Sequence, residues 1–425
     1  MAYIPAFNRY PPAVVQAFGR MERARGAIEA AQLLPAQEEI LRRDAKVGSI
    51  HYSNLIEGNE LSRVEALRAV EHELPPDDRA KLELVNYVAA LDFIGEKHRD
   101  GTIEYSSAFL KRLHGILTKG LGREATRFKP RHEGEWRDGV AAVGDAIAVF
   151  HVAPNPADVP DLMDERMDWL ARKRENPDYP APILAGVAHF EVAEVHPFAD
   201  YNGRTARLLA IAVLYREGFV ERPLFSPERY YAEDRDAYFG ALRAIKETRH
   251  LDEWLTYFVT GLAVEFERVA AKVRDLNAVT QALPLPLQLS AVQERAIAAL
   301  TVDRRRALTV AEFAELASTS VRTASRELNA LAEAGVLRAF GKTRDRRFAL
   351  ALRRASGVGR PRVWSDERVA TELSQFAEQL GAWPRYRDFE EAKMLPLYAA
   401  IARTYGLKGW RRRIETQTMN SRDSR

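Results

Sequence analysis

The 425-residue sequence contains no cysteine. This absence excludes disulfide bonds, thiolate nucleophiles and metal sites built from cysteine, and it fits a reducing compartment. The sequence also lacks a run of about 20 apolar residues, which a helix needs to span a bilayer. Residues 1–10 lack the charged start and apolar stretch of a signal peptide. We therefore expect a soluble, cytoplasmic protein with no membrane partner.

The net charge of +3 hides an uneven distribution. Residues 286–425 carry 26 Lys and Arg against 16 Asp and Glu, which gives them +10 and leaves −7 for residues 1–285. A basic region attached to an acidic body favours a polyanionic partner for the basic region alone. A solvated basic surface without any partner explains the same counts.

Apolar residues make up 46% of the sequence, and its length is enough for two or three domains. They recur at helical spacing through much of the chain. Around residues 137–150 the spacing changes, and Gly139 and Gly144 with Asp145 indicate turns, so we predict a short β-hairpin there. The fold class is therefore mainly α with one small hairpin. The expected helices cover residues 12–48, 61–70, 82–94, 162–171, 183–195, 204–216, 235–248 and 251–276.

Prolines and glycines divide the chain. Two prolines make residues 282–287 the clearest linker, because proline interrupts a helix. A second linker is indicated by the glycines and the proline of residues 355–361. The predicted domains cover residues 1–280, 286–352 and 362–416, the last being a small basic helical module.

The most informative stretch runs from His196 to Arg207 and reads His-Pro-Phe-Ala-Asp-Tyr-Asn-Gly-Arg-Thr-Ala-Arg. A new helix is expected after its Asn-Gly turn, and a helix start behind a glycine-bearing loop presents unpaired N–H groups that suit phosphate. Arg204 and Arg207 share one face of that helix and can clamp further phosphate oxygens. Asp200 offers an oxygen ligand for magnesium, and His196 is placed to accept a proton from an attacking hydroxyl. These parts suit in-line phosphoryl-type transfer.

This stretch resembles the signature of the Fic family, His-x-Phe-x-Asp/Glu-Gly-Asn-Gly-Arg-x-x-Arg. The resemblance covers about residues 10–275, and it implies a helical domain with a β-hairpin flap that transfers AMP from Mg-ATP to a hydroxyl of a target protein. By resemblance His196 is the base and Asp200 holds Mg²⁺. Asn202, Gly203 and Arg204 would cradle the α- and β-phosphates, and Arg207 would reach the γ-phosphate.

Residues 134–137 and the hairpin that follows them resemble the family's flap over the site. An edge of this hairpin could pair with an extended segment of the target protein and bring its hydroxyl to His196. A purely structural flap is the alternative.

Tyr201 departs from the family pattern, which has glycine or another small residue at this position. If the backbone there adopts a positive φ, tyrosine stores strain of about 1–3 kcal/mol. If the side chain points outward, little changes.

Residues 53–58, Ser-Asn-Leu-Ile-Glu-Gly, lie on an expected helix well before the loop. Ser53 and Glu57 share a helix face, and we expect Gly58 to let a neighbouring backbone approach closely. The segment resembles the family's inhibitory motif, Ser/Thr-x-x-x-Glu-Gly/Asn. By resemblance Glu57 pairs with Arg207 and denies it to the γ-phosphate. A surface glutamate without this role is the alternative.

Residues 308–337 indicate two helices joined by a short turn, with Thr309 and Ser320 as N-caps and Gly335 at the end. With the basic stretch that follows, they resemble a winged helix–turn–helix, which can contact DNA or another protein. The candidate DNA contacts are Arg322, Arg326, Lys342, Arg344, Arg346 and Arg347.

Two further functions remain open at the level of the sequence. One is a DNA-bound regulator whose Fic-like domain senses nucleotide or modifies itself. The other is a hydrolase that uses Glu57 to remove AMP from a modified protein. The sequence is also compatible with a homo-oligomer, and it identifies neither the target protein nor the modified side chain.

Overall fold

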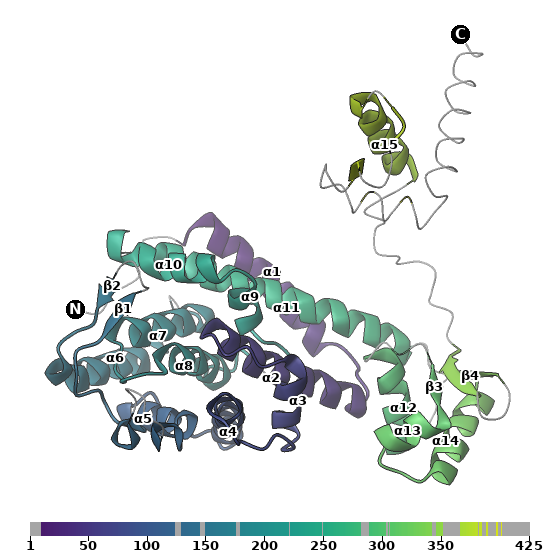
Figure 1. Cartoon of the computed structure of the whole chain (residues 1–425), viewed down its shortest axis with the longest axis horizontal. Coiled ribbons are helices and arrows are strands. Elements are labelled where there is room, and N and C mark those ends of the chain that lie inside the picture. The colour runs from purple at the N-terminus through teal and green to yellow at the C-terminus, as the bar shows by residue number, and fades with distance from the viewer. Residues whose placement is uncertain are drawn as a thin grey trace. The chain divides into compact units, whose positions relative to one another are not determined.

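The computed structural model describes most of the chain, and Figure 1 shows the arrangement of its elements. Two compact units divide at residue 351, Met1–Ala351 and Leu352–Arg425. The described residues are 10–123, 129–144, 149–175, 179–220, 222–248, 250–281, 289–302, 305, 307–341, 346–351, 366–380, 382–384, 388–389, 397 and 401.

Helices dominate the first unit, so the mainly α class is confirmed. Up to residue 281 they are α1 Pro12–Glu29, α2 Pro35–Ile56, α3 Arg63–Val70, α4 Arg79–Arg99, α5 Ser107–Leu117, α6 Val159–Lys173, α7 Ala181–Val195, α8 Asn202–Arg216, α9 Glu228–Glu233, α10 Arg235–Thr248 and α11 Asp252–Gln281. The expected helix over residues 12–48 is two helices, because the chain breaks at residues 30–34 and Pro35 starts α2. Helices α5 and α9 were not predicted.

Helix α7 lies in the interior of this unit and is apolar on all sides, which is why most of its residues are buried. It packs along α8, while α1 lies along the long helix α11 (Figure 1). Helix α2 crosses the unit and packs against α3, α4 and α9. The loop between α7 and α8 is thereby held between buried helices, with the C-terminal end of α2 beside it.

The expected hairpin is confirmed by the antiparallel strands β1 Ala142–Gly144 and β2 Val149–Val152. A bulge between Val143 and Gly144 interrupts the pairing. Of the expected turn residues, Asp145 lies outside the described residues.

Beyond residue 288 the first unit contains α12 Ala291–Thr301, β3 Leu308–Thr309, α13 Val310–Leu316, α14 Val321–Glu333, β4 Leu337–Phe340 and β5 Arg347–Leu350. The three strands form an antiparallel sheet in the order β3-β5-β4. Thr309 and Ser320 cap α13 and α14, and Gly335 follows α14 at φ 75°, as predicted. The assignment as a winged helix stays a prediction, as do the domain limits. The expected linkers at residues 282–287 and 355–361 lie outside the described residues.

In the second unit, α15 Asp366–Leu380 contributes to a small apolar cluster. Phe389 is fully buried against Phe376, and Trp383 packs on the cluster. Two further aromatic residues of the predicted module, Tyr405 and Trp410, lie outside the described residues.

We predict that the close approach of α11 to α7 makes Gly186 indispensable for stability. A Cβ atom at Gly186 would lie 2.8 Å from Leu255 Cδ2 and 3.1 Å from Phe258 Cδ1. Gly186→Ala should therefore lower the free energy of unfolding by about 1–3 kcal/mol through overpacking, despite alanine's better helix propensity. Urea denaturation followed by circular dichroism measures this change.

The matched control is Gly19→Ala on α1, where an added Cβ would meet no atom within 4 Å. This substitution should raise the free energy of unfolding by about 0.5–1 kcal/mol. Equal stabilisation by both substitutions would contradict the packing of α7 against α11.

Candidate active site

Hydrogen bonds of the Asn202 side chain stabilise the loop between α7 and α8. The Asn202 side chain accepts a hydrogen bond from the Phe198 N–H and donates one to the Phe198 carbonyl, both at 2.9 Å. Phe198 is fully buried and stacks on His114 with ring centroids 3.7 Å apart. The side chain of Asn202, expected to cradle phosphate, thus maintains the shape of the loop that would do so.

His196 ends α7 in a left-handed conformation, at φ 49°. Arg137 fixes this turn, since its backbone N–H donates to the Pro197 carbonyl (2.9 Å) and its Nε donates to the His196 carbonyl (2.8 Å). The other two guanidinium nitrogens donate to the carbonyls of Gly139 and Pro154, on either side of the hairpin. One buried arginine therefore ties the hairpin to the residue expected to act as the base.

His114 on α5 also supports this loop, through hydrogen bonds of both ring nitrogens. Its Nδ1 accepts a hydrogen bond from the Gly134 N–H (3.0 Å), so Nε2 carries the proton and donates to the Asp200 carbonyl (3.2 Å). Burial lowers the pKa of His114 to about 3, so the ring is neutral near neutral pH. His114 is therefore a structural support of the loop and not a second base.

Tyr201 adopts the positive φ whose strain the sequence analysis anticipated, at 64°. Its side chain does not point outward, because only 3% of the residue is exposed. The hydroxyl donates to Glu83 Oε1 (2.7 Å), and the Arg204 guanidinium lies 4.0 Å above the ring. The ring thus lies inside the site, against one of the two motif arginines.

Arg207 and Glu57 form the ion pair that the inhibitory motif implies. Arg207 Nη2 donates to Glu57 Oε1 at 2.8 Å. Ser53 holds the same guanidinium twice, through its hydroxyl at 2.8 Å from Nε and its carbonyl at 3.0 Å from Nη2. Arg207 Nη1 lies 3.4 Å from the Tyr238 hydroxyl. The guanidinium expected to reach a γ-phosphate is therefore held by Ser53 of α2, by Glu57 directly after that helix and by Tyr238.

The charges of this pair stabilise each other although Arg207 is buried. Burial alone raises the pKa of Glu57, but the positive charge of Arg207, followed by that of Arg204, outweighs burial and lowers it. Burial lowers the pKa of Arg207, and the Glu57 carboxylate more than reverses this and raises it. The Glu57 side chain keeps 28% of its surface exposed, whereas Arg207 keeps 1%.

The close approach expected at Gly58 is found at Gly203 instead. A Cβ at Gly58 would meet no atom within 4 Å, and this glycine serves the chain by adopting φ 88° directly after α2. A Cβ at Gly203 would lie 2.4 Å from Glu57 Oε1. The missing side chain of Gly203 is therefore what lets the carboxylate reach Arg207.

Arg204 is held by residues that the sequence analysis did not single out. Its Nη1 donates to Glu83 Oε2 (2.9 Å) on α4 and to Asn54 Oδ1 (3.0 Å) on α2. Arg79 lies one turn before Glu83 and donates to the Tyr201 hydroxyl (2.8 Å). The spacing of Arg79 and Glu83 marks them as neighbours on one helix face, but nothing local in the sequence indicates that this face meets the loop.

Asp200 is half-exposed at the end of the loop. One carboxylate oxygen accepts the Tyr201 N–H (2.7 Å), and the other lies 3.9 Å from Arg79 Nη2. Among the described residues no group of three or more His, Asp or Glu side chains is arranged to hold a metal ion. A single carboxylate fits magnesium only where a substrate supplies further oxygens, which is how magnesium commonly binds beside phosphates.

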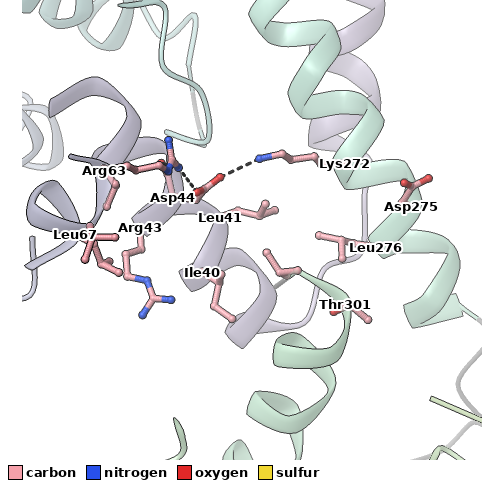
Figure 2. Close-up of a pocket in the computed structure, with 13 residues that line it drawn as sticks. Ile40, Leu41, Arg43, Asp44, Arg63, Leu67, Lys272, Asp275, Leu276 and Thr301 are labelled. Carbon is pink, nitrogen blue, oxygen red and sulfur yellow. Dashed lines mark hydrogen bonds and ion pairs between the residues drawn. The ribbon is translucent and has the colours of Figure 1, made fainter. Parts of the chain in front are cut away.

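A cleft of the described chain lies at a different place. It has a volume of about 450 Å³ and is lined by residues of α2, α3, α11 and α12. Figure 2 shows Asp44 between Arg63 and Lys272, and it pairs with both. Asp44 is thus shared by two cations, and none of the loop residues lines this cleft.

The candidate DNA contacts are only partly described. Arg322 and Arg326 are exposed one turn apart on α14, and Arg326 pairs with Glu327 at 2.7 Å. Arg346 and Arg347 are exposed beside and on β5. Lys342 and Arg344 lie outside the described residues. No helix of the described chain has the length and apolar character needed to cross a membrane.

The region that contains the loop is similar to known proteins. Residues 104–214 match the sequence profile of the Fic/DOC family. The chain is 28% identical over 232 residues to a protein adenylyltransferase Fic of Culex quinquefasciatus, covering 54% of this chain and 43% of that protein. It is 32% identical over 188 residues to a protein of the same name from Nematostella vectensis, covering 44% and 41%. The chain thus spans less than half the length of these relatives.

The fold is shared with solved structures. A Fic family protein of Desulfovibrio desulfuricans G20 superimposes with a TM-score of 0.55 at 21% sequence identity, covering 84% of this chain and 99% of that one. At this level of identity the likeness concerns the fold.

We predict that the Glu57–Arg207 pair gives the protein a pH-dependent increment of stability. The lowered pKa of Glu57 means that the increment is present above the pKa of the unfolded chain and is lost as the pH falls through the folded pKa. Glu57→Gln should therefore lower the free energy of unfolding at neutral pH by about 1.5–3 kcal/mol, the usual worth of a hydrogen bond to a charged group. The difference from wild type should vanish in acid.

Urea denaturation of both proteins between neutral and acid pH measures this difference. Glu60→Gln is the matched control, because Glu60 is an exposed glutamate three residues further along. A difference between wild type and Glu57→Gln that stays constant with pH would contradict the charge pairing.

Proposed function

With a Fic domain in residues 104–214 as the premise, we propose that the protein transfers AMP from Mg-ATP to a side-chain hydroxyl of a target protein. The observation that carries the proposal is the loop that ends α7 at His196 and starts α8 at Asn202, with two arginines on the first turns of α8. Relatives of this region are named protein adenylyltransferases, which supports the choice of AMP as the group transferred.

The chain's residues take part as follows. His196 accepts the proton of the target hydroxyl, whose oxygen forms a bond to the α-phosphorus of ATP. The bond from that phosphorus to the oxygen bridging to the β-phosphate breaks, and pyrophosphate leaves. The N–H groups at the start of α8, with Arg204 and Arg207, bind phosphate oxygens and neutralise their charge. Arg137 fixes the backbone of His196 at the end of α7 by donating a hydrogen bond to its carbonyl.

Asp200 is the residue that would hold magnesium, because its carboxylate is half-exposed at the same loop. Bound there together with phosphate oxygens, the ion would neutralise charge on the nucleotide. Arg79 competes weakly for this carboxylate at 3.9 Å.

We further propose that Glu57 inhibits this reaction by occupying Arg207. The pair is one charge-assisted hydrogen bond, worth about 1.5–3 kcal/mol. That is enough to keep Arg207 from a γ-phosphate by default, so the nucleotide binds without its α-phosphate in line with the hydroxyl. The exposed fraction of Glu57 gives the carboxylate room to leave when the inhibition is relieved.

The target protein is proposed to dock on the hairpin. Val140 and Val152 are 81% and 65% exposed at the end of the hairpin away from its turn, so apolar surface is available there to a target segment. An extended target segment pairing with a hairpin edge would bring a hydroxyl toward His196, to which Arg137 ties the hairpin.

We predict that Glu57→Gly raises labelling of the protein or its target by labelled ATP at least tenfold, which corresponds to about 1.4 kcal/mol. The reason is that Arg207 becomes available to the γ-phosphate. Adding His196→Ala to Glu57→Gly should cut the labelling by roughly 10²–10⁴, the usual worth of a general base. A labelling time course in the presence of magnesium measures both effects.

Glu60→Gly is the matched control, and it should label like wild type. Arg207→Ala should not reproduce the gain, because it removes the phosphate clamp together with its inhibitor. Labelling by Glu57→Gly at or below the wild-type rate would refute the inhibition, and loss of AMP removal by that variant would favour the hydrolase.

We also propose DNA as a partner of residues 286–425. The exposed arginines at the start of α14, together with the net charge of +10, support this partner. Binding should weaken steeply as salt is raised, because each neutralised phosphate releases counterions.

We predict that full-length Arg322→Ala binds a short DNA duplex more weakly than wild type and with a salt dependence that is less steep by about one counterion if Arg322 contacts phosphate. If Arg322 contacts a base, the loss is about 1–3 kcal/mol at a specific site. Fluorescence anisotropy across a salt series measures both quantities. Arg42→Ala, an exposed arginine of α2, is the control. Absence of binding by the wild-type protein at low salt would refute DNA as the partner.

A further inference from the structure

Tyr201 occupies a strained backbone position and fills it with a buried side chain. A residue other than glycine at a positive φ costs about 1–3 kcal/mol. Tyr201 nevertheless lies at φ 64° directly before α8, and 3% of it is exposed. The contacts of its side chain offset this cost, and they involve one residue of the proposed phosphate site, Arg204.

The Tyr201 side chain contacts Arg204 directly and through Glu83. Its ring lies 4.0 Å below the Arg204 guanidinium, a favourable cation–π arrangement. Its hydroxyl donates to Glu83 Oε1 at 2.7 Å, while Glu83 Oε2 accepts from Arg204 Nη1 at 2.9 Å. Arg79 donates to the same tyrosine hydroxyl at 2.8 Å.

Glu83 is fixed from several sides at once. Its carboxylate accepts hydrogen bonds from Tyr201, Arg204, Arg79 and the Asn59 side chain, the last at 3.0 Å. Burial raises the pKa of Glu83, but Arg204 and then the hydrogen bonds of its neighbours outweigh burial and lower it, so the group is ionised near neutral pH. Its side chain is 11% exposed. A carboxylate held by four donors stays in place.

We propose that Tyr201 and Glu83 are positioning residues that preset the Arg204 guanidinium for the phosphates of the nucleotide. The inference rests on the proposed function, because it takes Arg204 as a phosphate ligand. An arginine side chain that is free to rotate loses about 2 kcal/mol of rotamer entropy when it is ordered. Arg204 is already ordered, since its Nη1 is shared by Glu83 and Asn54 and one of its faces is covered by the ring. Phosphate binding therefore avoids most of this loss.

The two motif arginines, Arg204 and Arg207, are thus paired with carboxylates that differ in how firmly they are held. Glu57 has Arg207 as its side-chain hydrogen-bond partner among the described residues and is 28% exposed, so it is free to leave. Glu83 has four partners and cannot leave without breaking all of them. A second inhibitor would compete with phosphate for Arg204, whereas a positioning residue makes phosphate binding stronger. The two roles predict opposite changes in nucleotide affinity when Glu83 loses its charge.

The test measures the dissociation constant of Mg-ATP by isothermal titration calorimetry on the full chain carrying Glu57→Gly, so that Arg207 is available. Adding Tyr201→Phe should weaken binding roughly 3- to 10-fold, because the ring remains while the hydrogen bond to Glu83 is lost. Adding Glu83→Gln should weaken it at least as much. The same two substitutions are then made in proteins that also carry Arg204→Ala. If Tyr201 and Glu83 act through Arg204, each substitution should now change the dissociation constant less than about twofold, because the effects of interacting residues are not additive.

Tyr257→Phe is the matched control, because its buried hydroxyl makes no hydrogen bond within the described part of the chain. Thermal unfolding shows which variants fold, and Tyr201→Phe keeps the test valid if Glu83→Gln does not fold. Equal weakening with and without Arg204, or no weakening by Tyr201→Phe, would overturn the inference and leave the proposed function standing. Tighter binding by Glu83→Gln would make Glu83 a second inhibitor instead. Failure of the Glu57→Gly protein to bind ATP would overturn both the inference and the proposed function.

Discussion

The need to hold a buried arginine, Arg207, governs the arrangement around the loop. Its guanidinium is almost fully buried, and an unpaired charge at such a place would cost several kcal/mol. Ser53 of α2 and Glu57 directly after it supply the acceptors, so the C-terminal end of that helix has to lie against the start of α8. This contact in turn requires a glycine at Gly203, where a Cβ would collide with the carboxylate. The contact that we propose to be inhibitory is therefore also part of how the domain is assembled.

The loop could be predicted from the sequence because its information is local. A helix end, a turn and a new helix start follow one another within twelve residues, from His196 to Arg207, and the chemistry of each side chain is evident from its type. The pairing of Glu57 with Arg207 was inferred by resemblance, and the two residues are 150 positions apart in the chain. The hairpin was predicted from its change of spacing and its glycines, which are also local signals.

The supports of the loop could not be predicted, because each depends on a contact between segments that are distant in the sequence. Glu83 meets Arg204 across 121 residues, and Arg137 meets His196 across 59. A polar residue on a helix surface looks the same in the sequence whether it faces solvent or a neighbouring site. The expectation for Gly58 was wrong for a related reason. A glycine that ends a helix and one that admits a neighbour are indistinguishable until the neighbour is known, and here the second role belongs to Gly203.

The same geometry supports the two roles that we propose for these carboxylates, inhibition for Glu57 directly after α2 and positioning for Glu83 within α4. Glu57 follows the last residue of α2, and Gly58 after it turns the chain away at φ 88°. Its side chain can rotate out without disturbing the hydrogen bonds by which Ser53, one turn earlier, still holds Arg207. Glu83 lies within the second turn of the 21-residue helix α4, where it accepts hydrogen bonds from Arg79 of the same helix and from Asn59 in the segment after α2. Glu83 accepts four hydrogen bonds whereas Glu57 accepts one among the described residues, so fewer contacts oppose the release of Glu57. This difference supports our proposals that Glu57 is the inhibitor and Glu83 a positioning residue.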